Sequence, residues 1–218
     1  MNRALLLDAG NTVVFLDHGA VAETVGLRTE AVAAAEPVAK RRYEALLRSG
    51  GSHEDGWGLF MGELCREAGA EGPLVPLVDR LRAAHDRMNL WRRVPEDFRA
   101  ALDEARAGGW RIGVVSNSEG KLDELFEAVG LHDAFEVVID SALVGLRKPD
   151  PAIFHLALEA LGAEAAESWY AGDLPAVDVV GARAAGMNAA LIDPLGHYAD
   201  YAEAPRFASV GALVRTLG

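Results

Sequence analysis

Residues 4–12 read Ala-Leu-Leu-Leu-Asp-Ala-Gly-Asn-Thr, a short apolar run that ends abruptly in a polar turn at Asp8. An apolar run of this length, bounded by turn residues, is typical of a buried strand in a parallel sheet. Further runs of the same kind occur at residues 111–116, 135–139, 169–171 and 188–192. The chain therefore contains several predicted strands of the kind typical of a buried parallel sheet, and the first of them ends at Asp8.

Helical patterns separate these strands, at residues 95–107, 120–129, 151–161 and 176–185. Alternation of strand and helix predicts βαβ units, whose crossovers are right-handed and whose strands pair in parallel. We therefore expect an α/β fold with a Rossmann-like core of three layers, in which helices cover both faces of a parallel sheet.

The stretch from residue 19 to residue 90 interrupts this alternation, because it carries helical patterns and no convincing strand. Breaker clusters at residues 49–52 and 69–73 divide it. The helices expected within it span residues 19–35, 36–48, 53–70 and 73–89. The predicted organisation is a Rossmann-like core formed by residues 1–18 and 91–218, with an all-helical cap, residues 19–90, inserted after the first strand.

The amino-acid composition argues against several kinds of partner and site. The 218 residues are half apolar and carry a formal net charge of −12, which disfavours nucleic acid or an anionic membrane as a partner. Cys65 is the only cysteine, so an intramolecular disulfide and a multi-cysteine metal site are excluded, and packing explains this residue. With neither a signal peptide nor a long apolar span in the sequence, we expect a cytoplasmic protein, either a monomer or a homodimer.

The residues that suggest chemistry follow the ends of predicted strands, where open α/β sheets bind their ligands. They are Asp8, Ser116 with Asn117, Lys148, and Asp173 with Asp178. A carboxylate nucleophile, a hydroxyl, an ammonium group and further acidic groups are what phosphoryl transfer requires. Because the available ligands are oxygen atoms, Mg²⁺ is the expected cofactor, and a small anionic, phosphorylated molecule is the expected substrate.

Four segments, at residues 5–12, 114–117, 147–154 and 171–187, resemble in this order the four motifs of the haloacid dehalogenase superfamily. The resemblance spans nearly the whole chain, and the insertion between the first two motifs is similar to the type 1 helical cap of that superfamily. It implies a hydrolase of phosphatase type in which Asp8 forms an aspartyl-phosphate.

The resemblance also implies a role for each matching residue. Asp8, Asp173 and the main-chain carbonyl of Gly10 would coordinate Mg²⁺, while Ser116 and Lys148 would bind the phosphate. Three further residues would support this site. Asp178 would stabilise the metal site without contacting the ion directly, and Asn117 and Thr12 would hold the backbone around the site in place.

One position departs from the pattern. Phosphatases of the superfamily carry a second aspartate two residues after the nucleophile, as general acid and base, but this chain has Gly10 there, followed by Asn11 instead of the usual glycine. A general acid contributes roughly 10²–10⁴-fold to the rate, so its loss predicts slow hydrolysis of ordinary phosphate esters. Either the substrate has a good leaving group, such as an acyl phosphate, or another residue such as Asp17 or His18 supplies the proton, or the bond that breaks is not P–O.

Three alternatives to a phosphatase stay open on the sequence. A phosphate- and metal-binding protein with little or no turnover is consistent with Gly10. A dehalogenase needs no general acid, but it is independent of metal, and the carboxylates of Asp173 and Asp178 beside Asp8 favour a bound cation. A C–P bond hydrolase similar to phosphonoacetaldehyde hydrolase would use a cap lysine, and the single lysine of the insertion, Lys40, lies in a sequence unlike that enzyme's cap motif.

Overall fold

The computed structural model describes residues 2–51 and 53–218, and the chain divides into two compact units. The core unit comprises Met1–Phe15 and Arg92–Gly218, and the helical unit comprises Leu16–Trp91. The chain thus passes from one unit to the other twice, between residues 15 and 16 and between residues 91 and 92. Each unit has its own buried apolar cluster.

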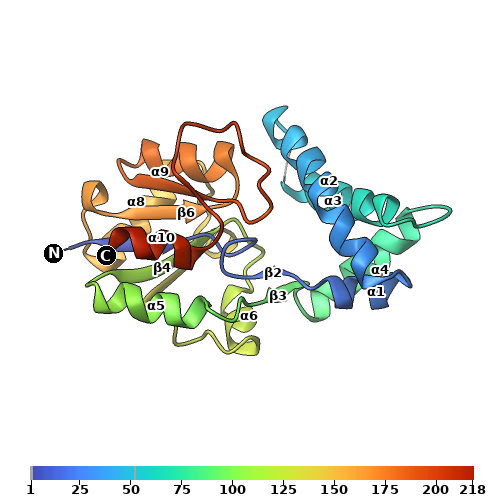
Figure 1. The fold of residues 1–218 in the computed structure, drawn as a ribbon, viewed down its shortest axis with the longest axis horizontal. Helices are drawn as coiled ribbons and strands as arrows, with labels where there is room; N and C mark the ends of the chain where they lie inside the picture. The colour runs from blue at the N-terminus through green and yellow to red at the C-terminus, as the bar shows by residue number, and fades with distance from the viewer. Residues whose placement is uncertain (1, 52) are drawn as a thin grey trace. The chain divides into compact units, whose positions relative to one another are not determined.

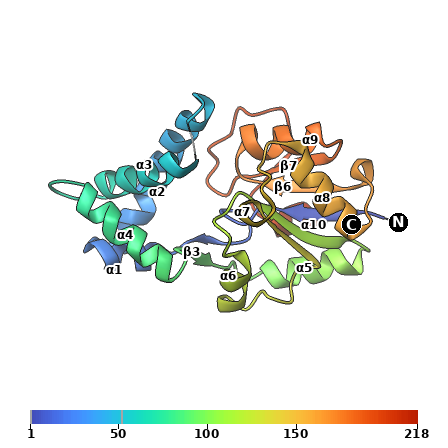
Figure 2. The same cartoon turned by 180° about the vertical axis from the view of Figure 1, so that it is seen from behind.

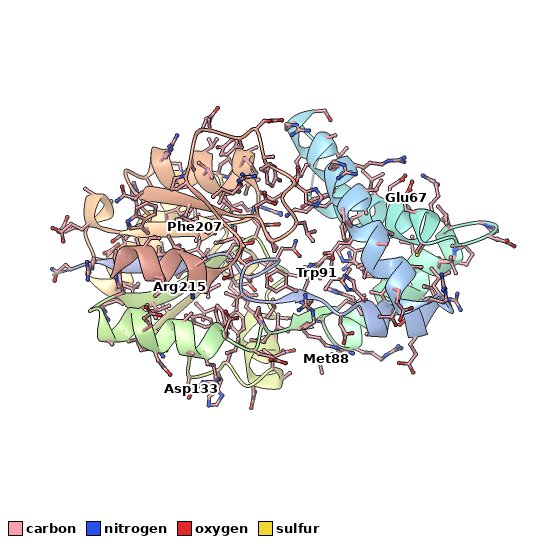
Figure 3. All side chains as sticks on the ribbon, in the orientation of Figure 1. Glu67, Met88, Trp91, Asp133, Phe207 and Arg215 are labelled. Carbon is pink, nitrogen blue, oxygen red and sulfur yellow. The ribbon has the colours of Figure 1, made fainter. Side chains whose placement is uncertain are left out.

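The core unit is built on a six-stranded sheet, which confirms the predicted α/β class (Figure 1). Its strands run in the order β5-β4-β1-β6-β7-β8, and every neighbouring pair is parallel. Their bounds are β1 (Ala4–Leu7), β4 (Arg111–Ser116), β5 (Val137–Asp140), β6 (Trp169–Gly172), β7 (Asn188–Ile192) and β8 (Arg206–Phe207). Phe207 of β8 is labelled in Figure 3.

Strand β1 lies in the middle of this sheet because all four of its residues are apolar and completely buried. It pairs with β4 on one side and β6 on the other, in a register that places Leu7 beside Val114 and Ala171. The backbone N–H of Asp8 continues the pairing by donating to the carbonyl of Ala171 (2.8 Å). This register brings the carboxyl ends of β1, β4 and β6 to one edge of the sheet.

Helices cover both faces of the sheet (Figures 1 and 2). Helices α8 (Pro151–Leu161) and α9 (Val180–Ala184) pack on the face formed by residues such as Leu6, Val115 and Tyr170. Helices α5 (Phe98–Ala107) and α10 (Val210–Leu217) pack against each other and against the opposite face. Shorter elements complete the unit: α6 (Leu122–Ala128), α7 (Ser141–Val144), the 3₁₀ turn η1 (Ala165–Glu167) and the π-helical turn η2 (Pro175–Val179).

The helical unit contains α1 (His18–Val25), α2 (Thr29–Arg48), α3 (His53–Glu67) and α4 (Val75–Arg87). Between residues 18 and 90 its described residues form helices and the turns that join them. The predicted boundary between helices at residues 35 and 36 is wrong. Helix α1 ends at Gly26, whose left-handed conformation (φ 75°) no other residue type adopts as readily, and α2 then continues through Pro37 to Arg48.

Aromatic rings contribute to the apolar cluster of the helical unit. Trp91, labelled in Figure 3, has its ring centroid 5.6 Å from that of Phe60 and 6.0 Å from that of His85. The two segments in which the chain passes between the units pair with each other as a two-stranded sheet, β2 (Phe15–Leu16) with β3 (Trp91–Arg93). In the part of the chain that the structure describes, no helix is long and apolar enough to cross a lipid bilayer.

Candidate active site

Asp8, Ser116 and Lys148 meet at the carboxyl edge of the sheet, and all three side chains are buried. The hydroxyl of Ser116 donates to Oδ1 of Asp8 (2.8 Å), and the ammonium group of Lys148 donates to the same oxygen (2.6 Å). Both donors therefore act on a single oxygen of the carboxylate. Charge-assisted hydrogen bonds of this kind fix the orientation of the acceptor, which leaves Oδ2 as the oxygen directed elsewhere.

Asn117 determines where the backbone of Lys148 lies. Its side-chain amide donates to the carbonyl of Lys148 (2.9 Å), and its side-chain oxygen accepts from the N–H of Lys148 (2.8 Å). Two bonds to one residue lock the loop before α8 onto the end of β4. The ammonium group consequently approaches Asp8 from a backbone that is held at the sheet edge.

Asp173 and Asp178 complete an acidic cluster with Asp8. Each of the three buried carboxylates offers an oxygen atom, and these atoms lie within 4.8 Å of one another. Both oxygens of Asp178 have partners, since Oδ1 accepts from Lys148 (2.7 Å) and Oδ2 from the N–H of Leu174 (2.9 Å). Gly172 makes room for that side chain, because a Cβ at this position would lie 2.3 Å from Cγ of Asp178.

The turn after β1 carries Gly10, Asn11 and Thr12. Asn11 has a left-handed backbone (φ 55°), which asparagine tolerates better than most residues. Its side-chain amide donates to Oδ2 of Asp173 (3.1 Å). The hydroxyl of Thr12 is buried and has no hydrogen-bond partner among the described residues, so the backbone tie expected from it is not seen.

Tyr170 belongs to the site but was missed by the sequence interpretation. Its hydroxyl accepts from Lys148 (2.7 Å) and donates to the main-chain carbonyl of Val115 (2.8 Å). A polar aromatic residue at the middle of a buried strand was the available signal. Its contact with Lys148 depends on the spatial arrangement of β6 and the loop before α8, which the sequence pattern does not contain.

Burial and neighbouring charge shift the protonation of these groups. Burial raises the pKa of Asp8 to about 7: the ammonium of Lys148 opposes the rise, and the carboxylates of Asp178 and Asp173 add to it. Burial lowers the pKa of Lys148, but Asp178 and Asp8 outweigh it, so the net shift is upward and the ammonium form persists. Burial also raises the pKa of Tyr170 well above its usual value, which keeps the hydroxyl protonated.

The donor set fits a hard divalent cation. The cluster holds three carboxylates and the ammonium group of Lys148, which pairs with Asp8 and Asp178, so negative charge is in excess among these four residues. That excess adds to the effect of burial in raising the pKa of Asp8. Carboxylate oxygens are the ligands that Mg²⁺ prefers. Since both oxygens of Asp178 are already engaged, Asp8 and Asp173 are the residues suited to contact an ion directly.

Other candidate residues lie in the helical unit and have local explanations. The carboxylate of Asp17 accepts from the N–H of Ala20 (2.9 Å) and so caps α1, while His18 pairs with Glu36 (2.7 Å). Cys65 is buried in the apolar cluster, and burial raises the pKa of its thiol. A thiol that is buried and protonated in this way packs as an apolar residue.

Fold and site together define the class of protein. A parallel sheet whose strand ends gather a carboxylate, a hydroxyl, a lysine and two further carboxylates is the architecture implied by the four sequence motifs. A family model for haloacid dehalogenase-like hydrolase matches residues 3–186. The chain therefore belongs to the haloacid dehalogenase-like hydrolase family.

The relatives match either most of this chain or about half of it. The bovine haloacid dehalogenase-like hydrolase domain-containing protein 3 is 31% identical over 206 residues, which cover 87% of this chain and 81% of the relative. A phosphoserine phosphatase from Thermus thermophilus is 39% identical over 105 residues, 47% of this chain and 42% of that enzyme. Among solved structures, the putative hydrolase YfnB of this superfamily from Bacillus subtilis superposes with a TM-score of 0.73 at 17% identity, covering 99% of this chain and 98% of that one.

Proposed function

We propose that this protein is a magnesium-dependent hydrolase that acts on a small phosphorylated metabolite through an aspartyl-phosphate at Asp8. The observation that carries the proposal is the arrangement around Asp8, whose Oδ1 accepts from Ser116 and Lys148 while a carboxylate oxygen of Asp173 lies within 4.8 Å of an Asp8 oxygen. One carboxylate oxygen is thereby held, and the other is left for attack. The phosphoserine phosphatase among its relatives supports the same reaction class.

The chain's own groups account for the first half of the reaction. A carboxylate oxygen of Asp8 attacks phosphorus, the bond from phosphorus to the leaving oxygen breaks, and the leaving group departs with that bond's electron pair. Ser116 and Lys148 then donate to phosphoryl oxygens instead of to Asp8. Mg²⁺, held by Asp8, Asp173 and the carbonyl of Gly10, would offset charge on the phosphoryl group when bound.

Gly10 determines which substrates suit this site. Glycine has no side chain to protonate the leaving oxygen or to activate the water that hydrolyses the aspartyl-phosphate. Leaving groups that are stable as anions need no proton, so acyl and aryl phosphates are expected to react faster than alkyl phosphates. A steep dependence of kcat/KM on the pKa of the leaving group is the expected result, and a flat dependence would mean that another residue supplies the proton.

The test of the proposal is turnover of an aryl phosphate with Mg²⁺, with chelator, and by Asp8→Asn. We expect activity that chelator removes and that Asp8→Asn lowers to the level of the uncatalysed reaction. Asp133→Asn is a matched control, because Asp133 is an exposed carboxylate of the same unit (Figure 3). Activity that survives Asp8→Asn would refute Asp8 as nucleophile, and halide release in the presence of chelator would favour a dehalogenase instead.

A binding protein with little turnover is the second candidate, and Gly10 is the residue that favours it. Such a protein would bind Mg²⁺ and inorganic phosphate without releasing product from any phosphorylated compound. A panel of phosphorylated metabolites assayed with and without chelator separates it from the hydrolase.

A further inference from the structure

The hydroxyl of Tyr170 is the neutral partner of Lys148, whose other two acceptors are carboxylates. Tyr170 is completely buried, and its ring packs edge-on against Phe154 with centroids 4.9 Å apart. The hydroxyl lies 2.7 Å from Nζ of Lys148 and 2.8 Å from the carbonyl oxygen of Val115. The ring is thus fixed by packing and the hydroxyl by hydrogen bonds.

The hydrogen bonds of Lys148 can be accounted for one by one. An ammonium group has three N–H donors and no acceptor. Three oxygen atoms accept from it: Oδ1 of Asp8 (2.6 Å), Oδ1 of Asp178 (2.7 Å) and the hydroxyl of Tyr170 (2.7 Å). The Tyr170 hydroxyl lies within donor range of the carbonyl of Val115 (2.8 Å) and, at a longer distance, of Oδ1 of Asp178 (3.3 Å). Whichever of them takes its single proton, a lone pair of the hydroxyl oxygen accepts from Lys148 (2.7 Å).

The third acceptor determines the direction of the ammonium group. With only two carboxylates as partners, Nζ could move between Asp8 and Asp178, and one N–H would be buried without an acceptor. Such a buried unsatisfied donor is unfavourable, so the side chain would shift to satisfy it. Because the Tyr170 hydroxyl accepts from the third N–H of Lys148, no donor of the ammonium group is left unsatisfied. Lys148 therefore stays directed at the oxygen of Asp8 to which Ser116 also donates.

We propose that Tyr170 is a positioning residue that holds the Lys148 ammonium group on Asp8 and thereby prepares it to bind the transferring phosphoryl group. This inference rests on the proposed function, because it assigns Tyr170 a part in the same reaction. Tyr170 acts through Lys148 and does not itself contact the substrate.

The first test removes the hydroxyl and keeps the ring, with Tyr170→Phe. Loss of one hydrogen bond to a charged group predicts a fall in kcat for an aryl phosphate of about tenfold. Ser168→Ala is the matched control, because Ser168 precedes the same strand, is completely buried, and accepts from the N–H of Ala4 (2.9 Å) away from the site. Equal kcat values for the two variants would overturn the proposal.

The second test asks whether the effect passes through Lys148. In a Lys148→Gln background, Tyr170→Phe is expected to cause no further loss of affinity for inorganic phosphate, whereas in the wild-type background it weakens that affinity several-fold. The same loss in both backgrounds would mean that Tyr170 only stabilises the core. Phosphate affinity is measured by calorimetry, so this test stands even if the wild-type protein hydrolyses no aryl phosphate and the proposed function fails.

A third measurement uses the wild-type protein and so does not depend on the folding of Tyr170→Phe. Three fixed acceptors predict that the ammonium protons of Lys148 exchange slowly with water and give a resolved NMR signal, which Lys148→Gln identifies by its absence. Exchange as fast as that of an exposed lysine would contradict the proposed positioning.

Discussion

Gly10 stands at the position where the resemblance to phosphatases of the superfamily leads us to expect an aspartate. The preceding strand places Asp8 at the sheet edge, and the turn that follows carries no acid at the position where a general acid would act. Gly10→Asp is therefore expected to raise kcat for alkyl phosphates by roughly 10²-fold, the lower end of the usual contribution of a general acid.

Gly10→Asn is the control for this substitution, because it adds a side chain of the same size that cannot donate an acidic proton. A rise in kcat with Asn equal to that with Asp would mean that the size of the side chain, not its acidity, changes the rate. No rise with Asp, in a protein that is folded and binds metal, would mean that missing acid chemistry does not explain slow turnover.

Asn11 gives a stability prediction for the same turn. At φ 55° a Cβ is unfavourable, so Asn11→Ala is expected to have a free energy of unfolding about 1 kcal/mol lower than Asn11→Gly. Both variants lose the amide contact with Asp173, so the comparison isolates the backbone. Urea unfolding measures the difference, and equal values would show that the turn relaxes when the side chain is removed.

At the scale of elements, α9 and α8 depend on a close approach at Gly181. A Cβ there would lie 2.7 Å from Cε2 of Phe154 and 2.9 Å from Cα of Pro149, the residue after Lys148. Gly181→Ala is expected to lower the free energy of unfolding by about 1–3 kcal/mol through overpacking, and to weaken phosphate binding because the Lys148 loop must move.

Gly211 of α10 is the matched position, since a Cβ there would have 3.4 Å or more to its nearest neighbours. Gly211→Ala should leave stability unchanged or raise it by up to about 1 kcal/mol, as alanine favours a helix over glycine. A Gly181→Ala variant as stable as Gly211→Ala would contradict the importance of the close contact.

The elements of the core were predictable to different degrees. Strands β1, β4 and β7 and helix α8 have the bounds expected from the sequence, because each is a distinct apolar or amphipathic run. Strands β2, β3 and β8 were not predicted, since two or three residues cannot display a periodicity. Helix α10 was overlooked although Ser209 is a good N-cap residue; its hydroxyl accepts from the N–H of Ala212 (3.2 Å), and the helix carries Arg215 (Figure 3).

The site was predictable where it depends on chain order and not where it depends on packing. Polar residues after parallel strands must meet at one edge, which is why Asp8, Ser116 and Asp173 were expected together. The contacts of Tyr170 with Lys148 and of Asn11 with Asp173 join side chains from different loops and strands. Their proximity follows from side-chain geometry that no pattern in a single sequence records.

At the scale of the whole molecule, stability depends on pH through the acidic cluster. The folded protein raises the pKa of Asp8 from its usual value near 4 to about 7. The unfolded chain therefore loses this proton first, so the metal-free protein is expected to lose stability as pH rises from about 4 to about 7. A divalent cation that neutralises the cluster reverses that loss.

Thermal unfolding with and without Mg²⁺ at pH 5 and pH 8 tests this linkage. The rise in Tm on adding Mg²⁺ should be larger at pH 8, where ligand oxygens are deprotonated, and Asp8→Asn should reduce the pH dependence of the metal-free protein. A magnesium effect that is the same at both pH values, or larger at pH 5, would contradict the assignment of Asp8 as a ligand.

Phosphorylation of Asp8 is the step on which the proposed hydrolase activity depends. Because Gly10 provides no base to activate water, the aspartyl-phosphate should persist long enough to be trapped by acid quench during turnover of an acyl or aryl phosphate. Mass spectrometry of the peptide that contains Asp8 is the direct measurement, and we predict the added mass of one phosphoryl group on that residue. Product formation with Asp8 unmodified at every quench time, or with the phosphoryl group on a different residue, would contradict the claim.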